Sequence, residues 1–258
     1  MSGAIDTLAK RVSLVLVMSA AACGPAATVA PPAAPAPISP PAAAAAETAV
    51  PPSIRWTRAA AEHDALFLQA YRVAEERVRA AEASLPDGTW AVILDADETV
   101  IDNSTYQWER ARQNLGYSRE SWNEWVRRRA APALPGAAAF TQAVRSLGGR
   151  VAIVTNRDEE VCEPTRDNLR AVGIAFDVVL CRTSEGDKNP RFQAVERGTA
   201  APGLPPLRVL LWVGDNILDF PALSQASRTQ PGALADFGQR FIVLPNPMYG
   251  SWEQLEVK

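Results

Sequence analysis

Five short apolar segments constrain the fold of this chain more than any other feature of its sequence. The segments are Trp90–Leu94, Val151–Val154, Val178–Leu180, Val209–Val213 and Phe241–Leu244. They are rich in Val, Ile and Leu and do not alternate with polar residues, which is typical of strands buried on both faces of a parallel sheet. The segments therefore predict a parallel sheet that is covered on both sides.

Stretches with helical spacing separate the predicted strands. They lie at Ser118–Arg129, Gly136–Leu147, Glu159–Val172 and Arg191–Arg197, and a longer one, Thr57–Ser84, precedes the first strand. Alternation of strands and helices favours an α/β fold with a doubly wound parallel sheet. We expect one such domain over residues 53–258, with an N-terminal helix. In these sheets the ligand lies beyond the carboxyl ends of the strands, so the residues there matter most.

The first 22 residues have the pattern of a secretory signal peptide. Lys10 and Arg11 precede an apolar run, Val12–Ala22, whose 11 residues are too few to span a bilayer as a mature helix. The small residues before Cys23 resemble a lipobox, in which the Cys is lipidated and becomes the new N-terminus. We therefore expect lipidation at Cys23 and attachment to a membrane through a lipid anchor. The alternative is ordinary cleavage nearby, with an incidental thiol.

Residues 24–52 are dominated by two residue types, with 12 Ala and 9 Pro in 29 positions. Such a segment cannot bury a core, and we expect a semi-rigid, extended tether. With the lipidated Cys23 it makes up a unit over 23–52 between the signal peptide and the folded domain. Gly24 follows the Cys, which by resemblance to Gram-negative sorting signals favours the outer membrane. The expected location is the cell envelope, as an outer-membrane lipoprotein or a periplasmic protein.

Charge and histidine content exclude several classes of function. Lys plus Arg is 26 and Asp plus Glu is 29, so the net charge is −3. No basic excess is present to neutralise a phosphate backbone, and a nucleic-acid polymer is not expected as a partner. The single histidine, His63, excludes sites built from several histidines. It lies far in sequence from every strand end, and we expect it to be exposed or to pack against a helix. Carboxylates are therefore expected to carry any catalysis.

Polar side chains gather at four of the predicted strand ends. They are Asp95 and Asp97, then Thr155 and Asn156, then Lys188, and finally Asp215 with Asp219. Carboxylates beside buried strands are costly to desolvate without a counter-charge. A divalent cation together with a phosphoryl group would satisfy the whole set, because the cation offsets the carboxylates and Lys188 offsets the phosphate.

With these motifs the chain resembles the haloacid dehalogenase (HAD) superfamily of phosphohydrolases over residues 53–258. More narrowly, it resembles the bacterial class C acid phosphatases, the lipoprotein e type of outer-membrane 5′-nucleotidase. The matching segments include DADETVIDNSTYQW at 95–108, VTNR at 154–157, DKNPRF at 187–192 and VGDNILDF at 213–220. The resemblance implies a HAD-like, Rossmannoid sheet with a small helical cap segment, over about 103–135.

The resemblance also implies the chemistry at the first strand end. Asp95 would be the nucleophile and form an aspartyl-phosphate, which splits one difficult displacement into two easier ones. Asp97 would act as general acid to the leaving alkoxide and then as general base to water. Asp95 and Asp215 would ligate Mg²⁺ through carboxylate oxygens, and Asp97 through its backbone carbonyl.

The remaining polar residues have supporting roles in the resembling family. Thr155, Asn156 and Lys188 would hold the phosphoryl group that is transferred, whose equatorial oxygens need electrostatic stabilisation. Asp219 would orient either Lys188 or a water on the metal.

Aromatic residues of the cap segment are expected to choose the substrate. In the resembling family, aromatics in this region pack over the base of the substrate. Tyr106 and Trp108 follow the nucleophile loop most closely, so we favour them, with a place in the core of the cap as the alternative. Trp122 and Trp125 lie three apart on one helical face and are expected in the core.

The cysteines other than Cys23 leave two possibilities open. Cys162 and Cys181 lie on neighbouring elements and could form a disulfide in an oxidising compartment, or remain buried thiols. Neither is expected to be catalytic, because no histidine lies nearby to act as a base.

The sequence as a whole predicts a Mg²⁺-dependent acid phosphatase that hydrolyses phosphomonoesters, with nucleoside 5′-monophosphates as the favoured small-molecule substrates. The alternatives are a broad-specificity phosphatase or phosphotransferase, and a non-catalytic envelope lipoprotein. The oligomeric state is left open, with a dimer as one possibility.

Overall fold

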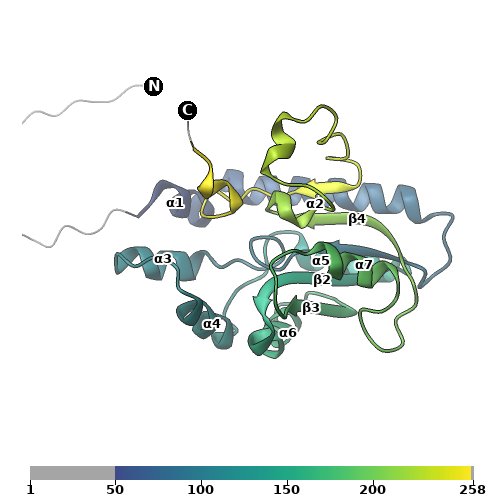
Figure 1. Cartoon of the computed structure of the whole chain (residues 1–258), viewed down its shortest axis with the longest axis horizontal. Coiled ribbons are helices and arrows are strands. Elements are labelled where there is room, and N and C mark those ends of the chain that lie inside the picture. Colours follow the sequence, from purple (N-terminus) through teal and green to yellow (C-terminus); the bar gives the residue numbers. More distant parts are fainter. Residues whose placement is uncertain (1–49, 257–258) are drawn as a thin grey trace, which may run out of the picture. The chain divides into compact units, whose positions relative to one another are not determined.

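The computed structural model describes residues 50–256 (Figure 1). The predicted signal peptide, Cys23 and nearly all of the tether lie outside the described residues, so these predictions are not tested. Among the described residues, no helix has the length and apolar character needed to cross a bilayer.

A five-stranded parallel sheet forms the centre of the fold. Its strands are β1 (Trp90–Leu94), β2 (Arg150–Asp158), β3 (Val178–Arg182), β4 (Arg208–Gly214) and β5 (Phe241–Val243). They lie in the order β3-β2-β1-β4-β5, and every neighbouring pair is parallel. The chain starts in the middle of the sheet and winds first to one edge and then to the other. The doubly wound α/β fold is therefore confirmed.

Seven α-helices accompany the sheet in the described residues. They are α1 (Pro52–Ala59), α2 (Ala61–Glu82), α3 (Ser104–Arg112), α4 (Arg119–Arg128), α5 (Ala137–Ser146), α6 (Cys162–Ala171) and α7 (Asn189–Glu196). Short 3-10 helices occur at Glu159–Val161, Ile217–Asp219, Gln225–Thr229 and Ser251–Gln254. Helices α3 and α4 occupy the segment that was expected to form a cap.

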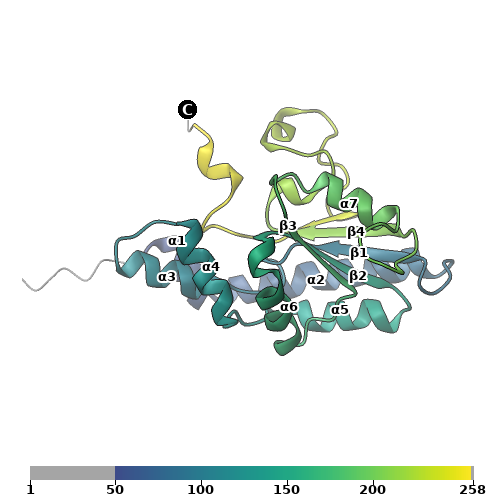
Figure 2. The ribbon, with the colours of Figure 1, turned by 60° about the horizontal axis from the view of Figure 1, so that its bottom comes forward.

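Both faces of the sheet are buried, as the apolar segments predict. Side chains alternate along each strand, so Val92 and Leu94 join the core on one face while Ala91 and Ile93 join the core on the other. Figure 2 shows α2, α5 and α6 on the first face and α7 on the second. The helices thus cover the faces of the sheet, and the carboxyl ends of the strands stay open to functional groups.

The predicted N-terminal helix is interrupted in the structure. We expected one helix over Thr57–Ser84, but it breaks at Ala60, whose backbone is extended. The break lets α1 pack against α3 while α2 runs along the sheet. His63 follows the break and is buried, with its ring in contact with Trp56 and Phe67. It therefore packs within the helices, one of its two expected environments.

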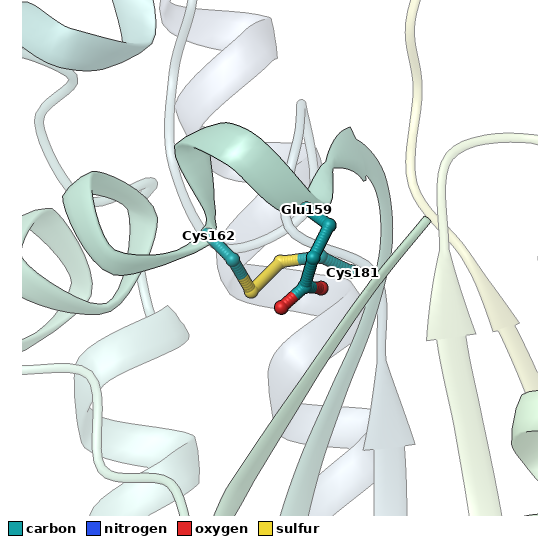
Figure 3. Close-up of side chains that lie close together, drawn as sticks. All are labelled: Glu159, Cys162 and Cys181. Atoms are coloured by element: carbon teal, nitrogen blue, oxygen red, sulfur yellow. A yellow bond between two sulfur atoms is a disulfide. The ribbon is translucent and has the colours of Figure 1, made fainter. Parts of the chain in front are cut away.

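The structure decides between a disulfide and two free thiols in favour of the disulfide. Cys162 begins α6 and Cys181 lies in β3, and their sulfur atoms are bonded (Figure 3). Glu159 lies beside the bond in the same view. Because both sulfur atoms are in the disulfide, Cys162 and Cys181 cannot act as thiolate ligands of a metal. The group formed by Glu159 and these two cysteines is therefore structural.

Candidate active site

A cavity of about 620 Å³ opens at the carboxyl ends of the strands. Six of the predicted site residues line it: Asp95, Asp97, Asn156, Lys188, Asp215 and Asp219. These residues lie in or shortly after β1, β2 and β4, and in the loop after β3. They meet at one cavity because parallel strands end at one edge of the sheet. The sheet therefore brings together groups that are far apart in sequence.

Asp95 lies directly after β1, and its backbone N–H donates to Val213 O at 3.0 Å, which fixes it in the sheet. Its carboxylate is buried, and Oδ1 accepts a hydrogen bond from Lys188 Nζ at 2.5 Å. Among the described residues no donor contacts Oδ2. Burial raises the pKa of Asp95 to about 7, and the charges of Asp219 and Asp97 add to the rise while Lys188 opposes it. The second oxygen is therefore available at the cavity.

Lys188 lies between two carboxylates. Its ammonium is 4% exposed and donates to Asp95 Oδ1 and, at 2.7 Å, to Asp219 Oδ1. Burial alone would lower the pKa of Lys188, but Asp219 and Asp95 together raise it above its usual value. Lys188 therefore remains a cation at the wall of the cavity. Of the two roles considered for Asp219, the structure shows the contact with Lys188.

A close approach at the end of β4 places Asp219. Its Oδ2 accepts the backbone N–H of Asn216 at 2.8 Å. A Cβ at Gly214 would lie 2.3 Å from the Asp219 Cβ, so only glycine allows this packing.

Asp95, Asp215 and Asp219 form an acidic cluster, with carboxylate oxygens within 4.8 Å of one another; Asp95 and Asp219 are buried and Asp215 is half-buried. Burial, reinforced by Asp219 and Asp95, raises the pKa of Asp215 well above its usual value. Asn246 Nδ2 and Thr99 Oγ1 each donate to one of its oxygens, at 2.9 and 3.3 Å. Three carboxylates face only one lysine, and the excess negative charge suits a hard divalent cation that takes oxygen ligands.

Asp97 is held from one side. Its Oδ1 accepts from Arg157 Nε at 2.9 Å and from Asn103 Nδ2 at 2.9 Å, and Arg157 Nη2 lies 2.7 Å from the same oxygen. The other oxygen, Oδ2, lies 3.5 Å from Thr155 Oγ1. Arg157 itself is 1% exposed. The sequence motif included Arg157, but its contact with Asp97 was not predicted.

Thr155 and Asn156 lie in the second half of β2, and of the two only Asn156 lines the cavity. Thr155 is completely buried, and its Oγ1 accepts the backbone N–H of Arg157 at 3.1 Å. The Asn156 amide is engaged on both sides, because Nδ2 donates to Gly186 O at 2.9 Å and Oδ1 accepts from Arg191. Contacts from these two side chains to a phosphoryl group stay predictions.

The aromatic residues chosen from the sequence are not at the cavity. Tyr106 is 2% exposed and packs edge-on against Trp122, and Trp108 lies between the guanidinium groups of Arg58 and Arg112. Neither is among the residues that line the cavity. Residues two apart on an α-helix point in nearly opposite directions, so Tyr106 faces α4 while Trp108 lies on the other side. We therefore correct their predicted placement over the substrate.

Other aromatic and apolar side chains line the cavity. Tyr117 and Trp122 line the cavity from the cap segment, and Met248 and Tyr249 line it from the loop after β5. Trp122, which was expected in the core, is half-buried: it packs against the core and also lines the cavity. Trp125 is buried as predicted. The rule that ligands lie beyond strand ends, applied also to the fifth strand, could have found Met248 and Tyr249. Tyr117 follows Gly116 between two helices and carries no comparable signal.

Comparisons with known proteins agree with this geometry. A family model described as HAD superfamily, subfamily IIIB (acid phosphatase) matches residues 27–252. The structure of the class C acid phosphatase from Bacillus anthracis is 31% identical in sequence, with a TM-score of 0.70. The match covers 78% of this chain and 85% of that one. The same Bacillus anthracis enzyme with tungstate bound matches at 30% identity and a TM-score of 0.69, over the same shares of the two chains.

Proposed function

Because the chain belongs to the acid phosphatases of HAD superfamily subfamily IIIB, we propose that it hydrolyses nucleoside 5′-monophosphates in a Mg²⁺-dependent reaction through an aspartyl-phosphate on Asp95. Membership makes the chain a phosphomonoesterase, and sets aside the alternative of a non-catalytic lipoprotein. The observation that carries the mechanism is the Lys188–Asp95 contact beside Asp97, Asp215 and Asp219 at one cavity.

The first step transfers the phosphoryl group to the protein. Asp95 Oδ2, which has no donor among the described residues, attacks phosphorus and forms a P–O bond, while the ester P–O bond breaks. Asp97 gives a proton to the departing oxygen, so that an alcohol leaves rather than an alkoxide. Lys188 stabilises the negative charge of the transferring group from the wall of the cavity.

The second step releases phosphate. Asp97, now ionised, takes a proton from a water molecule that attacks the phosphorus of the aspartyl-phosphate. The bond between phosphorus and Asp95 breaks, which regenerates the carboxylate and leaves inorganic phosphate. Asp97 ends the cycle protonated, as it began, so atoms and charges balance.

The acidic cluster fits a divalent cation. Burial raises the pKa values of both Asp95 and Asp215, and neighbouring carboxylates add to the rise: Asp219 and Asp97 at Asp95, and Asp219 and Asp95 at Asp215. A cation between the oxygens of Asp95 and Asp215 would relieve this. Asp219 has both oxygens committed, to Lys188 and to the Asn216 N–H. We therefore assign Asp95 and Asp215 as the carboxylate ligands. A bound Mg²⁺ would supply positive charge to the phosphoryl oxygens.

The nucleotide preference is supported by the aromatic side chains at the cavity. Tyr117 is 65% exposed, so its ring is free to stack on a base, and Trp122 and Tyr249 line the same space. The tungstate in the Bacillus anthracis enzyme is an oxyanion, as phosphate is. We infer that the phosphoryl group binds at the strand ends and the base among these rings.

Phosphate release from a panel of esters tests the proposal. Nucleoside monophosphates, sugar phosphates and an aryl phosphate are compared with and without Mg²⁺, with Asp95→Asn as the inactive reference. We expect turnover to require Mg²⁺ and to be fastest with nucleoside monophosphates. Equal rates on all esters would indicate a broad-specificity phosphatase. Turnover by a folded Asp95→Asn protein would refute the aspartyl-phosphate mechanism.

We further propose that the protein is exported and lipid-anchored at Cys23 in the outer membrane. The disulfide Cys162–Cys181 supports export, because disulfides persist mainly in oxidising compartments. Incorporation of labelled palmitate into the wild type but not into Cys23→Ser tests the anchor. A soluble periplasmic product with an unmodified thiol would contradict it.

A further inference from the structure

Arg157 is a buried cation beside the active site, and none of the steps above uses it. We propose that Arg157 is a positioning residue, which together with Asn103 clamps one oxygen of Asp97 so that the other, Oδ2, exchanges the proton with the leaving group. This inference rests on the proposed role of Asp97 as general acid. It adds a residue to the machinery and assigns the reacting atom of Asp97.

The contacts on Asp97 are strongly asymmetric. Oδ1 accepts from Arg157 Nε and Asn103 Nδ2, both at 2.9 Å, with Arg157 Nη2 at 2.7 Å. Within residues 50–256, Oδ2 has only the long contact with Thr155 Oγ1, at 3.5 Å. An oxygen that faces two or more N–H donors cannot readily carry a proton, because a protonated oxygen would point its hydrogen at theirs. Oδ2 is therefore the oxygen that the contacts leave available to give and take a proton.

The clamp is itself held by surrounding elements. Arg157 Nη1 donates to Thr165 Oγ1 on α6 at 3.3 Å, and Nη2 donates to Asn103 Oδ1 at 3.0 Å. Trp125 Nε1 on α4 donates to the same Asn103 oxygen at 2.8 Å. The planar guanidinium thus uses donors on three sides, a geometry that lysine cannot reproduce. The Asp97 rotamer is fixed from the sheet, from α6 and from the cap segment together.

Glu98 supports the Asn103 side of the clamp. It is 3% exposed, and its two oxygens accept from Asn103 N at 2.7 Å and Asn103 Nδ2 at 3.3 Å. Burial, reinforced by Asp97 and Asp215, raises its pKa well above the usual value. Asn103 is therefore held at its backbone and at its side chain, and it presents its amide to Asp97 in one orientation.

Stability alone does not account for this pair, in which Arg157 is buried and Asp97 is half-buried. Burying a guanidinium and a carboxylate costs desolvation that their attraction often only balances, so apolar residues of similar volume would serve a core at least as well. The pair lies at the cavity wall, where both Asp97 and Arg157 are lining residues. A fixed carboxylate next to the leaving group is what general acid catalysis requires.

The role makes a specific claim about leaving groups. An alkoxide is a poor leaving group and needs a proton from Asp97, whereas p-nitrophenolate is stable as an anion and does not. A misplaced Asp97 should therefore slow the cleavage of an alkyl phosphate much more than that of p-nitrophenyl phosphate. The readout is kcat/KM, because it covers only the steps up to departure of the alcohol and is unaffected by the later release of phosphate.

The experiment compares Arg157→Met and Arg157→Lys with the wild type on glycerol 2-phosphate and p-nitrophenyl phosphate, with Mg²⁺ present. General acid catalysis contributes about 10²–10⁴-fold, so for Arg157→Met we expect the loss on the alkyl ester to exceed that on the aryl ester by about 10²-fold. Arg157→Lys retains the positive charge but not the planar set of guanidinium donors. Its losses on the two esters should differ in the same direction, but by less. Thermal unfolding shows whether Arg157→Lys is folded. If Arg157→Met does not fold, Arg157→Lys takes its place in the comparison of the two esters.

Two reference variants separate the possible outcomes. Asp97→Asn should show the same selective loss at larger size. Arg191→Met removes an arginine that donates to Thr155 O and Asn156 Oδ1 rather than to Asp97, and it should slow both esters alike. If Asp97→Asn is selective and folded Arg157 variants slow both esters equally, the positioning role is wrong and the proposed function stands. If Asp97→Asn itself slows both equally, the general-acid role fails and the positioning role with it.

Discussion

The acidic cluster predicts that removing one of its charges stabilises the metal-free protein. Burial raises the pKa of Asp95 to about 7, whereas an Asp in an unfolded chain titrates near 3.9. The native state therefore binds this proton more tightly than the unfolded state does. It follows that the free energy of unfolding falls as pH rises through this interval and stays low above it. In Asp95→Asn this fall is absent, because an amide does not titrate.

The expected size follows from the two pKa values. Each pH unit between them is worth about 1.4 kcal/mol, so an ionised Asp95 lowers the free energy of unfolding by about 4 kcal/mol above neutral pH. The amide resembles the protonated carboxyl group in shape. We therefore expect Asp95→Asn to be more stable than the wild type by up to about 4 kcal/mol near pH 8, and no more stable near pH 4.

Urea unfolding followed by tryptophan fluorescence measures this difference in the presence of EDTA. Asp187→Asn is the matched control: Asp187 is exposed close to the site, and hydrogen bonds from Asn189 lower its pKa. Its replacement should therefore not stabilise the protein. Addition of Mg²⁺ should stabilise the wild type more than Asp95→Asn, which has lost a ligand. A variant no more stable than the wild type at high pH, or equally stabilised at low pH, would refute the reasoning.

Three further predictions follow from other contacts. Lys188→Met leaves two buried carboxylates without their cation, so it should lower the free energy of unfolding in EDTA by about 3–5 kcal/mol and abolish phosphate release. Replacing both Cys162 and Cys181 by Ser opens a loop with a sequence separation of 19, and should cost about 3 kcal/mol in denaturant unfolding without lowering kcat. Tyr117→Ala should lower kcat/KM for nucleoside monophosphates by about 5–150-fold, from about 1–3 kcal/mol of stacking, and spare glycerol 2-phosphate. Trp108→Ala, which removes a ring outside the cavity, should leave that selectivity unchanged.

Most of the sheet could be predicted because burial on both faces leaves a clear trace in the sequence. The bounds predicted for β1 match the structure, and those for β4 and β5 differ by a residue or so. The strand β2 extends further than predicted, to Asp158. The extra residues are polar, and they stay extended because Asp158 pairs with Arg182 of β3 in the ladder and accepts hydrogen bonds from its side chain. Apolar patterning cannot signal such an extension.

The charged part of the site could be predicted for a topological reason. Asp95, Lys188 and Asp219 end or follow different strands, and a parallel sheet must bring such positions together. Arg157 shows the limit of this reasoning. It also follows a strand, but an arginine at a strand end is ordinarily solvated. Its burial depends on Asn103 and Thr165, which lie 54 and 8 residues away in the chain.

The wall that meets the rest of the substrate is the least predictable part, because helix orientation decides it. The sequence places Tyr106 and Trp108 near the nucleophile loop, but proximity along the chain does not say which face of α3 turns toward the cavity. The Tyr106 hydroxyl pairs with Ser121 Oγ of α4 at 2.9 Å, and this contact turns its ring into the cap. Trp122 on α4 then reaches the cavity instead. Under the proposed function, substrate choice therefore depends in part on how two short helices pack against each other, whereas the phosphoryl chemistry depends on the sheet.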